Sequence, residues 1–305
     1  MNEQDQPTHK SKVGYVSLIG RPNVGKSTLL NNILGQKVSI ISDKPQTTRI
    51  SILGIKTTRH GQIVFIDNPG IHKPLHKLNK RMMSFVYSSL QTADVICLLI
   101  DATLKFGHGD EFVLETLKKV STPVFLLINK VDIIRKEKVL PLIDKYKDLF
   151  SFAEIIPISA LKGTNTDVLE QSIYQHLPEA EHIYSEDELS TQSQKFLLSE
   201  IIREKMLQYV EKELPFVTAV LINKIQEKKA KGKPLHYIHA DIIVEKDNHR
   251  RIILGRQGSL IKKIGTEARK EIQKVLESKV FLDLHVRVKK RWRDSANVLE
   301  LIEQQ

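Results

Sequence analysis

A glycine-rich segment near the start of this 305-residue chain restricts its fold more than any other feature. The segment reads GRPNVGKST at residues 20–28, directly after the apolar run at 13–19 and before a helical pattern. The spacing G-x-x-x-x-G-K-S between a strand and a helix is typical of a phosphate-binding loop. Its glycines let backbone N–H groups curl around an anion, and the helix N-terminus adds positive potential. The segment therefore predicts a strand–loop–helix unit that holds a nucleotide.

Apolar runs recur through the first half of the chain and predict a sheet. The runs at 94–100 and 123–128 are continuously apolar, which is typical of parallel strands covered on both faces. The short connection at Gly61-Gln62 favours a hairpin, so one strand is expected to be antiparallel. The pattern favours a doubly wound α/β domain at 13–178 after a flexible tail at 1–12. Its strands are expected at residues 13–19, 50–57, 62–67, 94–100, 123–128 and 154–158.

The second half has a different order of elements. Residues 179–193 are polar, and we interpret them as a linker. Beyond them the order α-β-β-α-α-β predicts an α+β domain at 194–293, followed by a tail at 294–305. The expected elements are a helix at 194–213, strands at 216–225 and 236–246 around a lysine-rich turn at 228–234, a strand-like segment at 252–254, a helix at 266–278 and an alternating strand at 280–289.

The positive charge of the chain is concentrated in one segment. The formal net charge is +11, and residues 251–293 contribute 13 Lys and Arg against 4 Asp and Glu. A charged run can be only a solvated face, but this concentration favours a polyanionic partner.

Cysteine content and hydropathy point to a cytoplasmic protein. The one cysteine, Cys97, lies in an expected strand and cannot form an intramolecular disulfide, which favours a reducing compartment. No run of about 18 apolar residues is present, so we expect no membrane span. Peripheral binding to an anionic membrane surface stays open.

Motifs at the ends of the expected strands form a candidate nucleotide site. Lys26 in the glycine-rich loop would neutralise the β- and γ-phosphates, and Ser27 would bind Mg²⁺. The turn Asp67-Asn68-Pro69-Gly70 follows the third expected strand. Because the carboxyl ends of parallel strands share one edge, Asp67 can hold the same Mg²⁺, usually through water.

The base is expected to meet residues 129–132, which read NKVD. The Asp132 carboxylate can accept from the N1–H and the amine of guanine, whereas adenine would leave a buried charge unpaired. Asn129 can bond the base edge or brace the phosphate loop, and the stem of Lys130 can lie over the base. The motifs predict GTP or GDP, and disfavour a P-loop phosphotransferase. The expected contacts are Gly20, Arg21, Pro22, Asn23, Val24, Gly25, Lys26, Ser27, Thr28, Asp67, Asn68, Pro69, Gly70, Asn129, Lys130, Val131, Asp132, Ser159, Ala160 and Leu161.

A second short motif, GRQG at residues 255–258, lies within the α-β-β-α-α-β order. That setting is the arrangement of a type II KH domain, whose GxxG loop clamps about four unpaired nucleotides. Ile253, Ile261 and Ile264 can form the groove floor or ordinary core. Trp292, among cations at 289–293, suits base stacking or core packing. The candidate RNA-binding residues are Gly255, Arg256, Gln257, Gly258, Lys262 and Lys263.

The chain resembles the Era group of translation-factor-class GTPases. The resemblance lies in GRPNVGKST, QTTR, NKVD and PISA, and it continues through LPEAEHIYSEDELS and SEIIREKM to cover residues 13–293. It implies a first switch at 46–50, with Thr48 as the Mg²⁺ ligand and Thr47 as the alternative. It also implies 16S rRNA near its 3′ end and the 30S subunit as partners, a role in subunit maturation, a monomer, and peripheral contact with the inner membrane face.

Two positions depart from the usual patterns and bear on hydrolysis. Asn68 stands where the family usually has Thr, and Ile71 stands where many small GTPases have a water-orienting Gln. Hydrolysis therefore cannot depend on the side chain of Ile71. In related GTPases an Asn at the position of Asn23 binds K⁺, so this residue is expected either to recruit K⁺ or only to shape the loop. The candidate catalytic residues are Asn23, Lys26, Thr48 and Gly70. The rival hypothesis is a membrane-associated signalling GTPase whose basic domain binds anionic lipid.

Overall fold

The computed structural model describes residues 11–230 and 233–305, and this part of the chain divides into two compact units. Residues 11–38, 51–71 and 86–191 form the first unit, and residues 39–50, 72–85 and 192–305 form the second. Most of the expected tail at 1–12 and the tip of the lysine-rich turn, at 231–232, lie outside the described residues.

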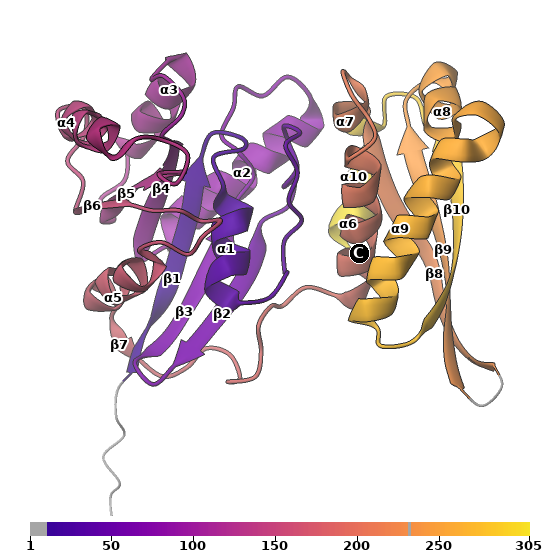
Figure 1. Ribbon diagram of the computed structural model, residues 1–305, viewed down its shortest axis with the longest axis horizontal. Coiled ribbons are helices and arrows are strands. Elements are labelled where there is room, and N and C mark those ends of the chain that lie inside the picture. The colour runs from indigo at the N-terminus through magenta and orange to yellow at the C-terminus, as the bar shows by residue number, and fades with distance from the viewer. Residues whose placement is uncertain (1–10, 231–232) are drawn as a thin grey trace, which may run out of the picture. The chain divides into compact units, whose positions relative to one another are not determined.

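The first unit is built on a sheet with the strand order β2-β3-β1-β4-β5-β6. The hairpin prediction is confirmed, because β2 runs antiparallel to β3 while the remaining pairs along this order are parallel. Helices α1 and α5 lie in front of the sheet in Figure 1, and α2 lies behind it. The strands are β1 (Ser11–Gly20), β2 (Ile52–Thr58), β3 (Gly61–Asp67), β4 (Val95–Asp101), β5 (Val124–Asn129) and β6 (Glu154–Pro157), with β7 (Glu179–Ala180) antiparallel to β1. The helices are α1 (Lys26–Leu34), α3 (His108–Leu117), α4 (Val139–Lys147) and α5 (Thr166–His176), whereas α2 (Lys77–Thr92) is divided, with its residues from Val86 onward in this unit.

The register of the parallel strands gathers the sequence motifs at one edge. Leu18 lies beside Asp67, and Asp101 lies beside Asn129. The continuous apolar runs become fully covered strands, as expected for the centre of a doubly wound sheet. Cys97 of β4 is completely buried, and burial raises the pKa of its thiol.

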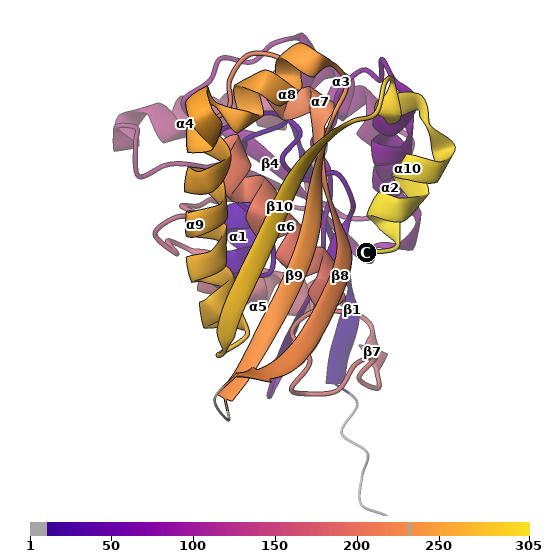
Figure 2. The ribbon, with the colours of Figure 1, turned by 90° about the vertical axis from the view of Figure 1, so that its right-hand side faces the viewer.

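The second unit contains a sheet in the order β10-β9-β8, shown with α6 behind it in Figure 2. β9 is antiparallel to β8 and parallel to β10. Alternate residues of β9 and β10 pack with α6 and α9 in one core, which confirms the alternation expected for the last strand. The strands are β8 (Thr218–Ala230), β9 (Lys233–Val244) and β10 (Lys279–Val288), and the helices are α6 (Gln194–Leu207), α7 (Leu214–Val217), α8 (Asp247–Leu254), α9 (Ser259–Val275) and α10 (Ala296–Glu303).

The order α-β-β-α-α-β is confirmed, but several local predictions are wrong. The segment expected as a tail at 294–305 contains α10, whose Val298 and Leu299 pack into a core with Trp292. The segment at 252–254 is the end of α8, because Ile253 and His249 share a buried helical face. Helix α9 begins at Ser259 and passes through Gly265 without a break. The lysine-rich turn is shorter than expected, since β8 continues to Ala230 and β9 starts at Lys233.

Within the described residues, no helix is both long enough and apolar enough to cross a bilayer.

Candidate nucleotide site and KH loop

The phosphate loop connects β1 to α1 and depends on a glycine at its end. Gly25 has a φ of 102° and precedes the first residue of α1. A Cβ at this position would lie 2.2 Å from the amide nitrogen of Asn129, so only glycine fits. Gly25 thus lets the loop turn directly into α1, whose N-terminal N–H groups are the expected anion contacts.

Lys26 is buried at the base of this loop. Its Nζ donates a hydrogen bond to the carbonyl oxygen of Arg21 at 3.2 Å. Burial lowers the pKa of Lys26 to about 8, and the nearby Asp67 carboxylate offsets part of that effect. A phosphate in the loop would favour the charged ammonium, as the predicted role requires.

Two predicted Mg²⁺ residues meet in the structure. The hydroxyl of Ser27, in the first turn of α1, donates to Oδ2 of Asp67, the last residue of β3, at 2.6 Å. A hydroxyl and a carboxylate at one point form the oxygen-rich set that Mg²⁺ prefers, so the residues fit this ion. The resemblance names Thr48 as a third ligand, and Thr48 is buried within the second unit. The hydroxyl of Thr47 donates to the carbonyl oxygen of Lys44 at 2.6 Å, which leaves the choice of Thr48 as a prediction.

Asn68 follows the carboxyl end of β3 and links it to β1 and to Ser51, which precedes β2. It is fully buried, and its amide nitrogen donates to the Ser17 hydroxyl at 3.0 Å and to the Leu18 carbonyl oxygen at 3.2 Å. Its Oδ1 accepts from the hydroxyl of Ser51 at 2.7 Å. The amide therefore satisfies acceptor groups of β1 and the donor group of Ser51, which explains how Asn serves where the family usually has Thr.

The turn after Asn68 lies directly against the phosphate loop. A Cβ at Gly70 would lie 2.7 Å from the backbone nitrogen of Pro22, and the N–H of Ile71 donates to the carbonyl oxygen of Gly20 at 2.9 Å. The side chain of Ile71 is 2% exposed. It is thus part of the core, consistent with hydrolysis that does not depend on this side chain.

Asn129 braces the loops of the site. Its amide nitrogen donates to the Val24 carbonyl oxygen at 2.7 Å, and its Oδ1 accepts from the N–H of Ala160 at 2.9 Å. Of the two roles considered for Asn129, the structure shows the brace. Asp132, three residues further along the chain, is exposed and therefore accessible to a base, and Leu161 is exposed as well.

Asp101 is a residue of the site that the sequence analysis missed. Its Oδ2 lies 2.5 Å from Nζ of Lys130, which has a φ of 66°. Burial raises the pKa of Asp101, but hydrogen bonds from Lys130 and Thr103 outweigh burial and hold it below its usual range. This pair fixes the lysine stem that is expected to cover the base. The available signal was an acidic residue at the end of a continuously apolar strand, the same position that Asp67 occupies.

The GRQG motif connects α8 to α9 in the second unit. Gly255 has a φ of 71°, and a Cβ there would lie 2.8 Å from the backbone nitrogen of Leu260. At Gly258, with a φ of 76°, no described atom lies within 4 Å of such a Cβ. One glycine is therefore needed for packing, while the other leaves the backbone open to a ligand. Arg256, Gln257 and Lys262 are exposed around the loop.

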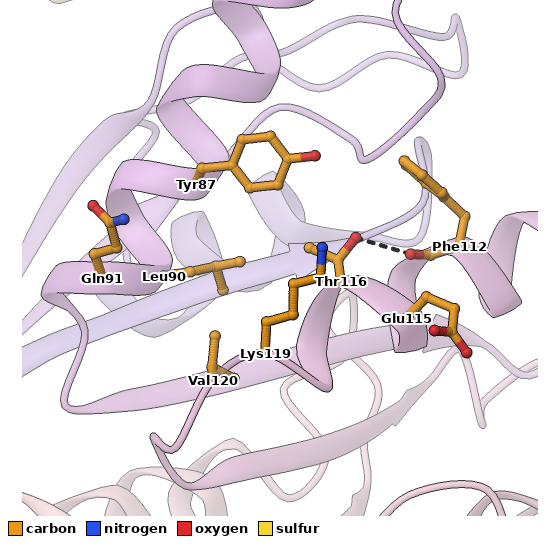
Figure 3. A pocket seen from close by; sticks show the side chains of 8 residues that line it. All are labelled: Tyr87, Leu90, Gln91, Phe112, Glu115, Thr116, Lys119 and Val120. Carbon is orange, nitrogen blue, oxygen red and sulfur yellow. Dashed lines mark hydrogen bonds between the residues drawn. The ribbon is translucent and has the colours of Figure 1, made fainter.

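A cavity in the first unit lies apart from these motifs. It has a volume of about 470 Å³ and is lined by Tyr87 and Leu90 of α2 and by Phe112 and Thr116 of α3, among others (Figure 3). Its lining includes none of the predicted nucleotide residues, so it is not assigned to the nucleotide.

Comparison with known proteins agrees with this geometry. Residues 15–130 match the family described as 50S ribosome-binding GTPase, and residues 220–293 match the KH domain. The GTPase Era proteins of two Clostridium kluyveri strains are each 48% identical to this chain over 289 residues, which cover 95% of this chain and 98% of the relative. The chain belongs to the Era family of GTPases.

Solved Era structures share the fold. A crystal structure of Era in complex with MgGDPNP and nucleotides 1506–1542 of 16S ribosomal RNA has a TM-score of 0.92 and 42% identity, and the match covers 96% of this chain and 98% of that one. A variant of Aquifex aeolicus Era bound to GDP·AlF4⁻ has a TM-score of 0.91 and 42% identity, with 95% and 98% covered. GTP and GDP with Mg²⁺ are therefore the ligands of this Era-family GTPase.

Two predictions for the KH part of this Era-family chain are settled by burial. Ile253 and Ile264 are completely buried in the core, whereas Ile261 is only partly covered. Trp292 is also completely buried, and its Nε1 donates to the carbonyl oxygen of Val217 at 2.8 Å. The interpretation of Trp292 as a base-stacking residue is wrong, because its ring closes the core between the sheet and α10. Lys263 lies with Nζ 4.2 Å from the ring of Tyr209.

The expected first switch of this family packs within the second unit. Arg49 donates to the carbonyl oxygens of Thr218 and Pro215, each at 2.7 Å, and its guanidinium lies 5.6 Å from the Trp292 ring centroid. Arg203 of α6 donates to the Thr47 carbonyl oxygen. The expected switch is thus attached to the KH part of the second unit, residues 192–305, by buried charge-assisted hydrogen bonds.

Proposed function

We propose that this chain couples its GTP or GDP state to the binding of single-stranded 16S rRNA near the 3′ end, during maturation of the 30S subunit. The observation that carries the proposal is the Arg49 contact, which joins the expected nucleotide switch to the first strand of the KH unit. The similar Era structure that holds nucleotides 1506–1542 of 16S rRNA supports the choice of RNA.

At the nucleotide site, the proposal assigns binding and charge stabilisation to different residues. Asp132 selects guanine through its carboxylate, and Lys26 stabilises charge on the phosphates. Ser27, Asp67 and Thr48 would hold Mg²⁺, which supplies neutralising charge at the β- and γ-phosphates. The N–H of Gly70 would donate to the γ-phosphate.

Hydrolysis is proposed to be slow and stimulated by K⁺. Ile71 is buried and apolar, so a water molecule has no side-chain partner at this position. Asn23 is exposed in the phosphate loop and has a φ of 64°. Its carbonyl group would help bind a K⁺ ion that supplies the positive charge of an arginine finger.

Coupling is proposed to run through the switch rather than only through the linker at 179–193. Thr48 precedes Arg49 in the chain, so recruitment of Thr48 by GTP and Mg²⁺ would displace Arg49. Because Arg49 is 5% exposed and donates to the carbonyl oxygen of Thr218, the first residue of β8, its displacement would repack that strand end. Release of the γ-phosphate would reverse the change.

The test is RNA binding by the full chain in both nucleotide states. Fluorescence anisotropy with a labelled single-stranded segment of the 16S rRNA 3′ end would be recorded with a non-hydrolysable GTP analogue and with GDP. The affinity of native protein for this RNA should differ between the GTP analogue and GDP. The double variant Gly255→Asp, Gly258→Asp should lose RNA binding and keep its affinity for GDP.

Two results would overturn the proposal. RNA affinity of the double variant equal to that of native protein would exclude the KH loop as the RNA site. Binding of native protein to anionic vesicles but not to RNA would favour the rival, a membrane-associated signalling GTPase. The proposed location is the cytoplasm, with a peripheral fraction at the membrane.

A further inference from the structure

Four ionisable residues form a compact block on the KH sheet. His239 and Asp241 lie on β9, and Asp283 and His285 lie on β10. The parallel register pairs His239 with Asp283 and Asp241 with His285. Because alternate residues of a strand share a face, all four lie on the face opposite the core that contains Ile238 and its neighbours. Each imidazole therefore has a carboxylate beside it.

The distances within the block suit a shared ligand. Nδ1 of His239 lies 2.9 Å from Oδ2 of Asp283, and Nε2 of His285 lies 3.1 Å from Oδ1 of the same carboxylate. Potential ligand atoms of these three residues all lie within 4.8 Å of one another. In a tetrahedral site with bonds of about 2 Å, ligand atoms are about 3.3 Å apart. The observed separations lie around that value, so the three groups are close enough together to share one ion.

A buried oxygen of Asp241 gives separate support for a ligand at this block. It is 7% exposed, and its Oδ2 accepts from Nε of Arg287 at 2.7 Å. Its Oδ1 is buried and has no hydrogen-bond partner among the described residues. This oxygen lies 3.9 Å from Nε2 of His239. Burying a carboxylate oxygen without a hydrogen-bond donor costs free energy of folding. The position of the Asp241 Oδ1 near the His239 ring therefore needs an explanation.

A metal ion accounts for that position. A histidine that binds metal through Nδ1 carries its proton on Nε2, and a metal-bound histidine almost always donates this proton to a carboxylate or carbonyl group. Asp241 is placed to accept it from His239 after a small tilt of the ring. Arg287 holds Asp241 in position. The block therefore has both the ligands and the supporting carboxylate of a metal site.

We propose that His239, Asp283 and His285 bind a divalent transition-metal ion, with Asp241 as the hydrogen-bond partner of His239. Imidazole with carboxylate suits Zn²⁺, Co²⁺ and Ni²⁺, whereas Mg²⁺ prefers oxygen ligands in an octahedron. Zn²⁺ is the expected ion, since three protein ligands leave a fourth tetrahedral position for water or an added ligand. The site is separate from the nucleotide site and does not depend on the proposed function.

The test uses the full chain saturated with GDP and Mg²⁺, so that the nucleotide site does not compete. Zn²⁺ is titrated in the presence of a chromophoric chelator, and Co²⁺ is added separately to record its visible absorption. Native protein should bind one Zn²⁺ at this site. His285→Gln should weaken that affinity at least about tenfold, and Asp241→Asn should weaken it about 10–100-fold.

The matched control is His236→Gln, which should leave Zn²⁺ affinity unchanged. His236 lies on the same strand but on the other face, where its ring contacts the Ser278 hydroxyl. His285 is about half exposed, so its replacement should leave the fold intact, which circular dichroism would check. Equal Zn²⁺ affinities for native protein and His285→Gln would overturn the proposal. Native protein that shows no Co²⁺ absorption band would overturn it independently of any variant.

Discussion

The substitution Asn129→Ala tests how the nucleotide site is built. Asn129 is 2% exposed, and its amide joins the carbonyl oxygen of Val24 to the N–H of Ala160 at 2.7 and 2.9 Å. Alanine would leave both backbone groups buried without these partners. We expect the variant to be less stable without nucleotide and to bind GDP more weakly, because the phosphate loop loses its brace.

The size of the effect follows from the two lost hydrogen bonds. A buried polar group left without a partner costs about 1–3 kcal/mol, so two groups cost about 2–6 kcal/mol of the free energy of unfolding. If about 2 kcal/mol of this cost falls on the bound conformation of the loop, the affinity for GDP falls about 30-fold. The melting temperature of the nucleotide-free protein should fall by roughly 2–4 °C for each kcal/mol lost.

Calorimetry of the nucleotide-free protein and titration with a fluorescent GDP analogue measure the two effects. Asp132→Asn is the matched control: its carboxylate is exposed, so it should lose GDP affinity and keep the native melting temperature. If Asn129→Ala weakened GDP binding while the nucleotide-free melting temperature stayed native, Asn129 would be a base contact, and the brace reasoning would be refuted.

Three further predictions concern hydrolysis, pH and coupling. GTP hydrolysis should be at least about tenfold faster in K⁺ than in Na⁺, and Asn23→Ala should remove the difference; equal native rates in the two salts would exclude a K⁺ role. Burial lowers the pKa of Lys26 to about 8 from 10.5, and phosphate binds the charged form, so GDP affinity should fall as pH rises from 8 towards 10.5. The nucleotide-free protein should become more stable over the same range, because the folded state no longer has to bury the charge; affinity that is flat with pH would contradict the Lys26 role. Arg49→Lys loses the fork that reaches both carbonyl oxygens, so RNA affinity, measured by anisotropy, should become equal in GTP analogue and GDP; a preserved difference would exclude this route.

Much of the nucleotide site could be predicted because its chemistry lies in short segments. The phosphate loop, Asp67 and the NKVD segment each follow an apolar run, and parallel strands bring their ends to one edge. Asp101 was missed because its partner, Lys130, directly follows the neighbouring strand β5. The pairing depends on the register of β4 and β5, which hydrophobic periodicity does not specify.

In the KH part of the chain, the order of helices and strands could be predicted, but the type of one short segment and the roles of some side chains could not. Three apolar residues at 252–254 are too few to distinguish a helix from a strand, and only the buried face shared with His249 decides for α8. Trp292 among cations fits a stacking surface or a core equally well until Val217 is seen to accept its N–H. The block around Asp283 depends on the alignment of β9 and β10, far apart in sequence.

Because Cys97 is buried, its reaction with a thiol reagent can measure how often the sheet of the first unit opens. The chain has one thiol, at the centre of a covered strand, and burial keeps it in the protonated, unreactive form. A thiol reagent can therefore react only when β4 separates from its neighbours, so the labelling rate measures that opening directly. The same strand ends at Asp101, beside the expected guanine pocket. Labelling should slow when GDP binds, which would give a readout of nucleotide occupancy without an engineered cysteine.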